Sequence, residues 1–155
     1  MALKNTIGQS WAHIDVELQR RYDLISRLVE VVKGYARHEG ETLAQTTRAR
    51  SGISVEDANT SVRQDADLLG RIMMVVERYP ELKANEQFAE LQLALVETED
   101  RIARRRSAYN ECVSRYEIYR QTFPFVIVVW AGHYAPVTFF DADEQAANAI
   151  RVVLS

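Results

Sequence analysis

The sequence contains few of the residues from which disulfide-stabilised folds and common active sites are built. Its single cysteine, Cys112, excludes an intrachain disulfide, and no histidine lies near it in the sequence to activate the thiol. Glycine-rich phosphate loops, GxSxG and CxxC are absent, and HEGE (38–41) lacks the HExxH spacing of a zinc site. We therefore expect no catalytic residues, no metal and no cofactor.

The chain also lacks a strong net charge and an apolar run of membrane length. The net charge is −3, and Glu97 and Asp100 offset the basic stretch RIARRR (101–106) along a helix, so nucleic-acid binding is not expected. The longest apolar run, FVIVVWAG (125–132), is far shorter than the roughly 20 residues that a bilayer requires. We expect a soluble chain with neither a transmembrane segment nor a signal peptide.

Proline and glycine are scarce as well, which leaves room for long helices. Apolar residues recur at a/d heptad spacing over three segments. These segments are about 3–50, 54–78 and 86–122. Ser54 and Asp57 resemble a capping box, and Asn85 is a good N-cap, so they begin the second and third helices. Pro80 and Pro124 end those two helices because proline cannot continue the hydrogen-bond ladder.

The helix lengths set the expected topology. At 1.5 Å per residue, the three helices would be about 70, 37 and 55 Å long. The second is too short to return along the whole first helix, so we interpret YPELKAN (79–85) as a spacer that lowers the start of the third. In an alternative interpretation, Pro80 begins a short extra helical turn. In both cases the first two helices run antiparallel, and the third runs parallel to the first.

The last part of the chain, 123–155, gives weaker signals. VIVV (126–129) suits either a short strand or a buried helical turn, DADEQAANA (141–149) suits a short helix, and the final residues suit an extended end. The sequence therefore predicts an all-α fold in a single domain, 1–155. It is an up-down bundle of three long helices plus a short C-terminal helix or extended tail.

Charged residues interrupt the apolar ladders of the three predicted helices. They are Arg21, Glu39, Asp65 and Arg105. An unpaired buried charge is very costly, so the two arginines would need carboxylate partners. The candidates for this pairing are Asp23, Glu39, Asp65 and Glu99. Three interpretations stay open: a network that fixes helix register, a ligand or catalytic site, or side chains that extend to solvent.

Several blocks of the sequence resemble the LemA family of bacterial proteins. They are WAHIDVELQRRYDLISRLVEVVKGYARHE (11–39), ERYPELKANEQFAELQ (77–92), ETEDRIARRRSAYN (97–110), FP (123–124) and FFDA (139–142). The resemblance implies a helical bundle that is usually tethered by one N-terminal membrane helix, with no established catalytic residues and an unknown biochemical role. Ser26 stands where the family commonly has proline, so the first helix should be straighter than in relatives.

The resemblance also marks recurring charged positions. They correspond here to Arg20, Arg21, Asp23, Lys33, His38, Glu39, Glu99, Arg101, Arg105 and Arg106, with Asn110 as the matching amide. Together with the ladder position Asp65, they define a candidate polar network that is either structural or a site. Its members are Arg21, Asp23, His38, Glu39, Asp65, Glu99, Arg101, Arg105 and Asn110.

These features favour a non-enzymatic helical scaffold or interaction module with protein partners at a bacterial membrane. We expect any membrane attachment to come from an upstream anchor absent from this chain, because LKNTIGQSW (3–11) begins where the family's soluble part begins. The alternative is a ligand-binding or enzymatic protein that uses the charged cluster between the helices. A closed, paired network would favour the first hypothesis, and an open cleft lined by the same groups would favour the second.

Overall fold

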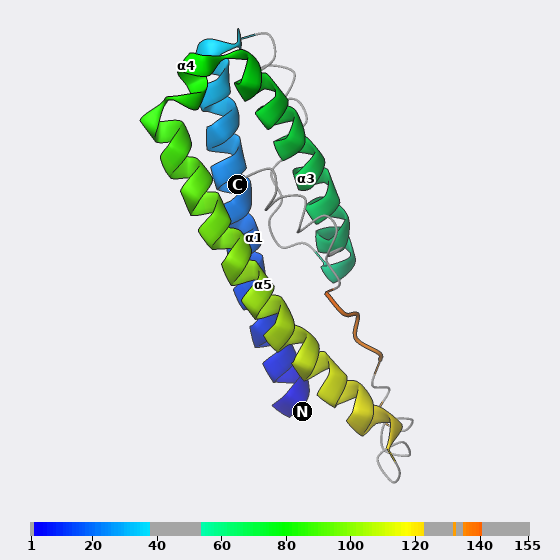
Figure 1. The fold of residues 1–155 in the computed structure, drawn as a ribbon. Helices are drawn as coiled ribbons and strands as arrows, with labels where there is room; N and C mark the ends of the chain where they lie inside the picture. Colours follow the sequence, from blue (N-terminus) through cyan, green and yellow to red (C-terminus); the bar gives the residue numbers. More distant parts are fainter. Residues whose placement is uncertain (1, 38–53, 123–131, 133–134, 141–155) are drawn as a thin grey trace.

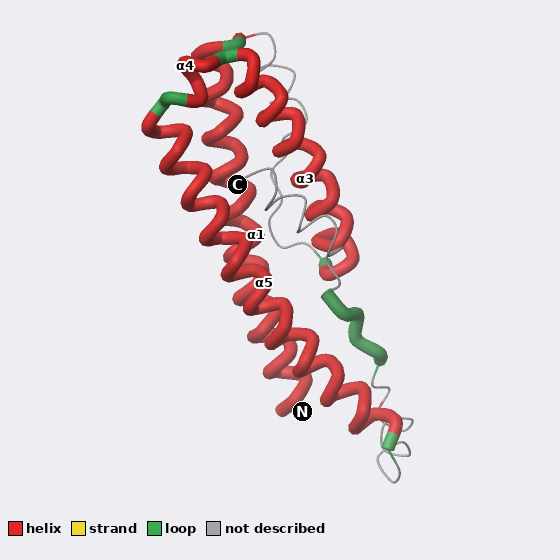
Figure 2. The backbone as a smooth tube through the Cα atoms, viewed as in Figure 1, coloured by secondary structure: helices red, strands yellow, loops and turns green. Residues whose placement is uncertain are grey.

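The computed structural model describes residues 2–37, 54–122, 132 and 135–140 (Figure 1). Within these ranges the chain forms helices and loops, with no strand (Figure 2). The helices are α1 (Ala2–Tyr35), α3 (Val55–Arg78), α4 (Pro80–Lys83) and α5 (Glu86–Gln121). The predicted all-α bundle of long helices is confirmed. The predictions for 38–53, 123–131 and 141–155 lie outside the described residues.

The helix boundaries that depend on local sequence signals lie where the sequence predicts them. The Ser54 side chain accepts a hydrogen bond from the Asp57 amide at 3.2 Å, and the Asn85 side chain accepts one from the Phe88 amide at 2.9 Å. Both satisfy amide groups that the first turn of a helix leaves without a partner. Pro80 opens the four-residue helix α4, so the alternative interpretation of the 79–85 segment is confirmed.

The first helix is shorter than predicted. It ends at Tyr35, and the chain leaves the helical conformation at Ala36, whose amide still donates to the Val32 carbonyl at 2.8 Å. The prediction of one uninterrupted helix over 3–50 is therefore wrong at this point. Gly34 lies in the last turn, where its low helix propensity weakens the helix. With 34 residues, α1 is about 51 Å long rather than 70 Å.

The directions of the helices also differ from the prediction. The chain runs the same way along α1 and α3 and returns along α5, as the colours in Figure 1 show. The predicted order, with the second helix antiparallel and the third parallel to the first, is wrong. That prediction assumed that the first helix reaches Arg50 and that the chain reverses direction in a short turn at 51–54. Because α1 ends at Tyr35 rather than at Arg50, the premise of that prediction does not hold.

Among the described residues, the interior consists of two apolar clusters, one toward each end of α1. Core A joins the second halves of α1 and α3 to α4 and the start of α5, and includes Leu28, Ile72, Leu82 and Leu95. Core B joins the first halves of α1 and α3 to the second half of α5, and includes Ile14, Val62, Ile102, Tyr109 and Phe140. Helix α1 packs along α5 over most of its length and contacts α3 more sparsely. The buried arginine Arg21 lies where the two cores meet, together with its carboxylate partners Asp65 and Glu99.

Candidate functional site

Arg21 lies at the level where core A and core B meet. It falls on α1 between Leu18 of core B and Leu24 of core A. Its side chain is only 1% exposed, and it joins three helices. The Nη2 atom lies 2.8 Å from Asp65 Oδ2 on α3, and the Nη1 atom lies 3.4 Å from Glu99 Oε1 on α5. A guanidinium group suits this position because its planar array of donors can face two carboxylates at once.

A second ion cluster lies one helical turn earlier on α1. Glu17 Oε2 accepts a hydrogen bond from Arg101 Nε at 3.1 Å, and Glu17 Oε1 lies 3.7 Å from Arg105 Nε. Arg101 also donates to the Thr98 hydroxyl at 3.3 Å. We call these two clusters together the charged layer. Its members are Glu17, Arg21, Asp65, Glu99, Arg101 and Arg105.

The charged layer is formally neutral and is closed at its centre. It combines the carboxylates Glu17, Asp65 and Glu99 with the same number of guanidinium groups. Arg21 Nε is buried and finds no hydrogen-bond partner among the described residues. Arg105 lies at the solvent-exposed edge of the layer, where its side chain is 42% exposed. The layer therefore has no uncompensated charge that would attract an ionic ligand from solvent.

The structure assembles only part of the polar network predicted from the sequence. Asp23 is exposed and accepts a hydrogen bond from Gln19 at 3.3 Å rather than joining Arg21. Residues two apart on a helix do not share a face, which explains its separation from Arg21. His38 and Glu39 lie outside the described residues.

The sequence reasoning did not identify Glu17, although two signals pointed to it. Glu17 and Arg21 are four residues apart and therefore lie on one face of α1. Glu17 also flanks the apolar stripe, at a position from which side chains often form ion pairs between helices. The ladder analysis considered only the a and d positions, so it missed this carboxylate.

Asn110 belongs to a different cluster, which holds an extended segment against the bundle. This segment, residues 135–140, is called the strap here and is the orange stretch between α3 and the end of α5 in Figure 1. Four side chains of α5, called the clamp, bind its main chain. The contacts run from Tyr116 Oη to Ala135 O (3.0 Å), Val137 N to Glu117 Oε1 (3.1 Å), Tyr109 Oη to Thr138 O (2.9 Å), Phe140 N to Asn110 Oδ1 (3.0 Å) and Asn110 Nδ2 to Phe140 O (3.0 Å).

Phe140 is the single buried anchor of the strap. Its side chain is fully buried in core B, and its ring meets Trp11 edge-on with centroids 5.6 Å apart. Trp11 also contacts Tyr109 of the clamp at 5.7 Å. The neighbouring Phe139 is 43% exposed, so the two aromatic side chains of the strap have very different surroundings.

Two carboxylates at the strap have lowered pKa values. Partial desolvation would raise the pKa of Glu117, but the Val137 amide and the hydrogen bond and charge of Arg120 outweigh it and lower the pKa. The pKa of Glu56 on α3 is lowered chiefly by the hydrogen bond that it accepts from the Thr138 hydroxyl. Burial, followed by the charge of Glu56, raises the pKa of Tyr109. Both carboxylates therefore hold the strap in their ionised form.

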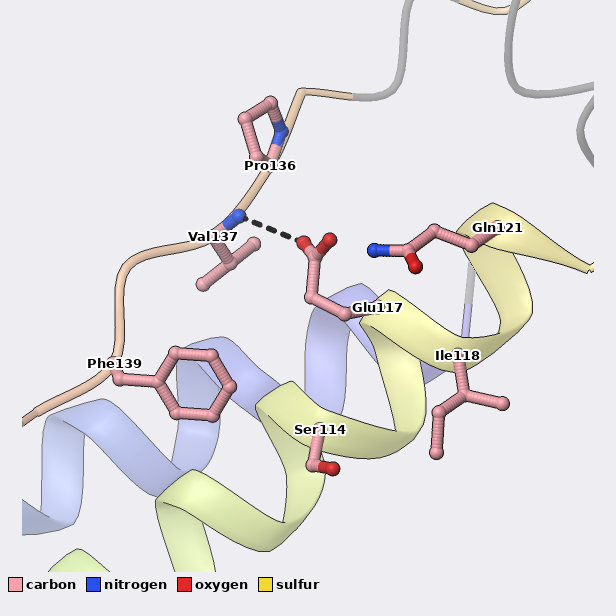
Figure 3. Close-up of a pocket in the computed structure, with 7 residues that line it drawn as sticks. All are labelled: Ser114, Glu117, Ile118, Gln121, Pro136, Val137 and Phe139. Atoms are coloured by element: carbon pink, nitrogen blue, oxygen red, sulfur yellow. Dashed lines mark hydrogen bonds between the residues drawn. The ribbon is translucent and has the colours of Figure 1, made fainter.

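An open pocket lies between the strap and the last turns of α5 (Figure 3). The strap contributes Pro136, Val137 and Phe139 to its lining, and α5 contributes Ser114, Glu117, Ile118 and Gln121. Figure 3 shows Glu117 beneath the strap with its bond to the Val137 amide. The contact between the strap and α5 is thus incompletely packed on this side.

The described part of the chain has neither a cluster of potential metal ligands nor a membrane-spanning helix. No group of at least three histidine, cysteine, aspartate or glutamate side chains there is arranged to hold a metal ion. None of the helices in those ranges is long and apolar enough to cross a membrane.

Comparison with known proteins finds relatives over most of the chain. The model of the LemA family matches residues 10–153. Magnetosome proteins MamQ 1 and MamQ 2 of Paramagnetospirillum magneticum are each 36% identical over 72 residues, which cover 46% of this chain and 26% of the relative. Protein LemA of Metamycoplasma hominis is 25% identical over 125 residues, covering 77% of this chain and 57% of the relative. The matched segment thus spans about a quarter of the length of the magnetosome relatives.

Proposed function

The chain belongs to the LemA family, and from this premise we propose that it is a non-enzymatic helical interaction module that binds protein partners at a bacterial membrane. The observation that carries the proposal is the arrangement of the charged layer. Its central arginine, Arg21, is 1% exposed and faces two carboxylates within the bundle. A ligand would have to break these pairs to reach the guanidinium group, and leaving one partner buried without its counter-charge carries a large penalty.

The position of the charged layer between the two cores supports a structural role for it. Asp65 and Glu99 lie on α3 and α5 at the same level as Arg21 on α1. Sliding any one of these helices by a turn would separate the ion pairs and bury a lone charge. Polar residues inside helical bundles commonly fix register in this way. A rigid bundle with fixed register suits a protein that presents surfaces to partners.

The membrane location is part of the proposal and is supported by the family resemblance. The bundle would lie outside the lipid and be tethered by a segment upstream of these residues. The relatives named as magnetosome proteins are consistent with action at a membrane compartment, and they match this chain over 46% of its length. No residue of the bundle itself is assigned to lipid contact.

The test is a pull-down from the native membrane fraction, with the purified chain as bait and chemical cross-linking to retain weak partners. The bait is compared with the version expressed together with the upstream genomic codons. We expect saturable retention of specific membrane proteins, stronger for the longer version. The absence of any specific partner would overturn the interaction function.

A ligand screen by thermal unfolding tests the alternative function. Small anions and dicarboxylates are added to the wild-type chain and to Arg21→Met. A rise in melting temperature for the wild type that Arg21→Met abolishes would favour a ligand site at the charged layer. We expect no such difference, because the two terminal nitrogens of Arg21, Nη1 and Nη2, already face Glu99 and Asp65.

A further inference from the structure

We propose that the clamp of α5 is a docking site for an extended peptide of a partner protein, and that the strap is a resident ligand which covers it. This inference rests on the proposed interaction function and adds the surface and the chemistry of the partner. The partner segment would have a β-type extended main chain and one aromatic side chain that replaces Phe140.

The first argument is that the clamp recognises main-chain atoms. The phenols of Tyr109 and Tyr116 donate to strap carbonyls, and Glu117 accepts from a strap amide. Asn110 binds the amide and the carbonyl of the same residue, Phe140, at 3.0 Å each. Such contacts depend on an extended backbone and not on the side chains of the bound segment. Any extended peptide in the same register could therefore make them.

The second argument is that one side chain supplies the specificity. Phe140 is fully buried in core B, where its ring meets Trp11, whereas the other strap residues are exposed or partly exposed. Main-chain hydrogen bonds supply affinity and a pocket for a side chain supplies specificity when an extended peptide is recognised. The chemical class of the ligand follows from this arrangement.

The third argument is that the strap can be displaced. It orders six residues but buries only one apolar side chain deeply, and an open pocket remains beneath Val137 and Phe139. Ordering six residues costs backbone conformational entropy. This cost counts against the free energy gained by burying one apolar side chain. Because the strap is covalently attached, it competes at a high effective concentration and lowers the apparent affinity for any outside peptide. Weakening the strap should therefore expose the site.

The test uses a fluorescent, end-capped peptide with the sequence APVTFF and four forms of the full chain. Phe140→Ala removes the resident anchor and leaves the clamp intact, and Phe139→Ala is the matched control because its side chain is exposed. We expect Phe140→Ala to bind the peptide at least tenfold more tightly than either the wild type or Phe139→Ala. Adding Asn110→Ala to Phe140→Ala should remove most of that gain, as should replacing the last phenylalanine of the peptide with alanine.

A second measurement avoids dependence on a folded Phe140→Ala variant. Excess peptide is added to the wild-type chain, and hydrogen exchange is followed at the Val137 and Phe140 amides. We expect faster exchange at both amides as the peptide displaces the strap, while amides in α5 stay protected.

Unchanged exchange together with equal peptide binding by wild type and Phe140→Ala would overturn the proposal. A wild-type dimer that Phe140→Ala converts to a monomer would overturn it too, since the occupant would then be a second copy of the chain.

The outcomes separate this inference from the function on which it rests. If Phe140→Ala with Asn110→Ala retains membrane proteins in the pull-down as well as the wild type does, the interaction function stands and the clamp is not its site. If the peptide binds as expected but no partner is retained, the docking site stands and the membrane interaction function fails.

Discussion

At the scale of single residues, the central physical fact is a guanidinium group buried between two cores. Arg21 is 1% exposed and faces Asp65 and Glu99, which belong to different helices. The desolvation of these groups is offset only while both carboxylates remain paired. The stability of the bundle should therefore depend on this side chain far more than on any surface ion pair.

Replacing Arg21 with methionine should lower the free energy of unfolding by about 3–5 kcal/mol, the usual cost of breaking a buried pair from one side. The variant keeps an unbranched apolar side chain but leaves the two carboxylates without their guanidinium partner. Urea unfolding followed by far-ultraviolet circular dichroism would measure the loss. Arg21→Lys should recover part of it, because an ammonium group restores the charge but cannot face both carboxylates with a planar fork.

Arg105→Ala is the matched control for this prediction. Arg105 lies 3.7 Å from Glu17 and is 42% exposed, so its removal should cost no more than about 1 kcal/mol. From the sequence alone, Arg105→Ala would also cost about 3–5 kcal/mol if its pair were buried, since Arg105 occupies a ladder position that calls for an apolar residue. The long side chain instead reaches the rim of the bundle. Equal midpoints for Arg21→Met and the wild type would contradict the buried pairing.

The charged layer also shows which functional residues could be predicted from the sequence and which could not. Arg21 and Asp65 could be found because they interrupt apolar ladders, and Glu99 because it is a recurring charged position in the family resemblance and a candidate partner for the arginines. Glu17 could not be found from the ladders because it flanks the stripe. Which carboxylate meets which arginine depends on the directions of the helices, and the predicted directions were wrong.

At the scale of elements, the helix starts are set by short local signals. Asn85 caps α5 through the Phe88 amide, and its Nδ2 atom donates to the Tyr35 hydroxyl at 2.9 Å. Both contacts lie at one end of the bundle, where α1 ends and α5 begins. The cap therefore links the start of one helix to the end of another.

Asn85→Ala should reduce the stability by about 1 kcal/mol, the typical cost of losing an N-cap. Asn85→Asp should be close to the wild type, because a carboxylate still accepts the Phe88 amide and can accept the Tyr35 hydroxyl. Thermal unfolding of the three proteins would show the order. A melting temperature for Asn85→Asp as low as that of Asn85→Ala would contradict the capping role.

The strap is an element that the sequence could not reveal. Residues 135–140 have no helical or alternating pattern that predicts their position, and only tertiary contacts from α5 and α3 hold them. Asn110 was noticed through the family resemblance, but its role became visible only when Phe140 was placed beside it. The helix caps, by contrast, need only residues within one turn and were predicted correctly.

The attachment of the strap should depend on pH. Glu117 has a pKa below its ordinary value of 4.5, because its bonds to Val137 and Arg120 outweigh partial desolvation. A carboxyl group whose pKa is lowered by folding stabilises the folded form above the ordinary pKa, and this stabilisation is lost as the pH falls through the lowered value. The strap should therefore be held at neutral pH and loosen below about 4.5.

Nuclear magnetic resonance would follow this loosening through the chemical shift of the Val137 amide. We expect a titration with a midpoint below 4.5, the ordinary pKa of the group, that Glu117→Gln abolishes. Glu111→Gln is the control, because Glu111 pairs with Arg115 on the exposed side of α5 rather than with the strap. A Val137 shift that titrates unchanged in Glu117→Gln would show that another group controls the strap.

At the scale of the whole molecule, the directions of the helices decide which residues meet. Helix α5 runs opposite to α1, so the start of α1 lies beside the end of α5. The predicted arrangement, with these two helices parallel, would have placed Ser10 and Cys112 far apart, because a helix rises about 1.5 Å per residue. In the structure, Ser10 Oγ and Cys112 Sγ are 3.9 Å apart. This pair therefore tests the topology directly.

Ser10→Cys should form a disulfide with the native Cys112 under mild oxidation, because a small rotation of the two side chains would bring their sulfur atoms into bonding distance. The cross-link would close a loop between positions 102 residues apart, so the oxidised protein should migrate faster on non-reducing electrophoresis and melt at a higher temperature. Val16→Cys is the control, because Val16 is 67% exposed and its thiol should stay free within the chain. Free thiols in oxidised, folded Ser10→Cys, or equal cross-linking of Val16→Cys, would refute the antiparallel packing of α1 on α5.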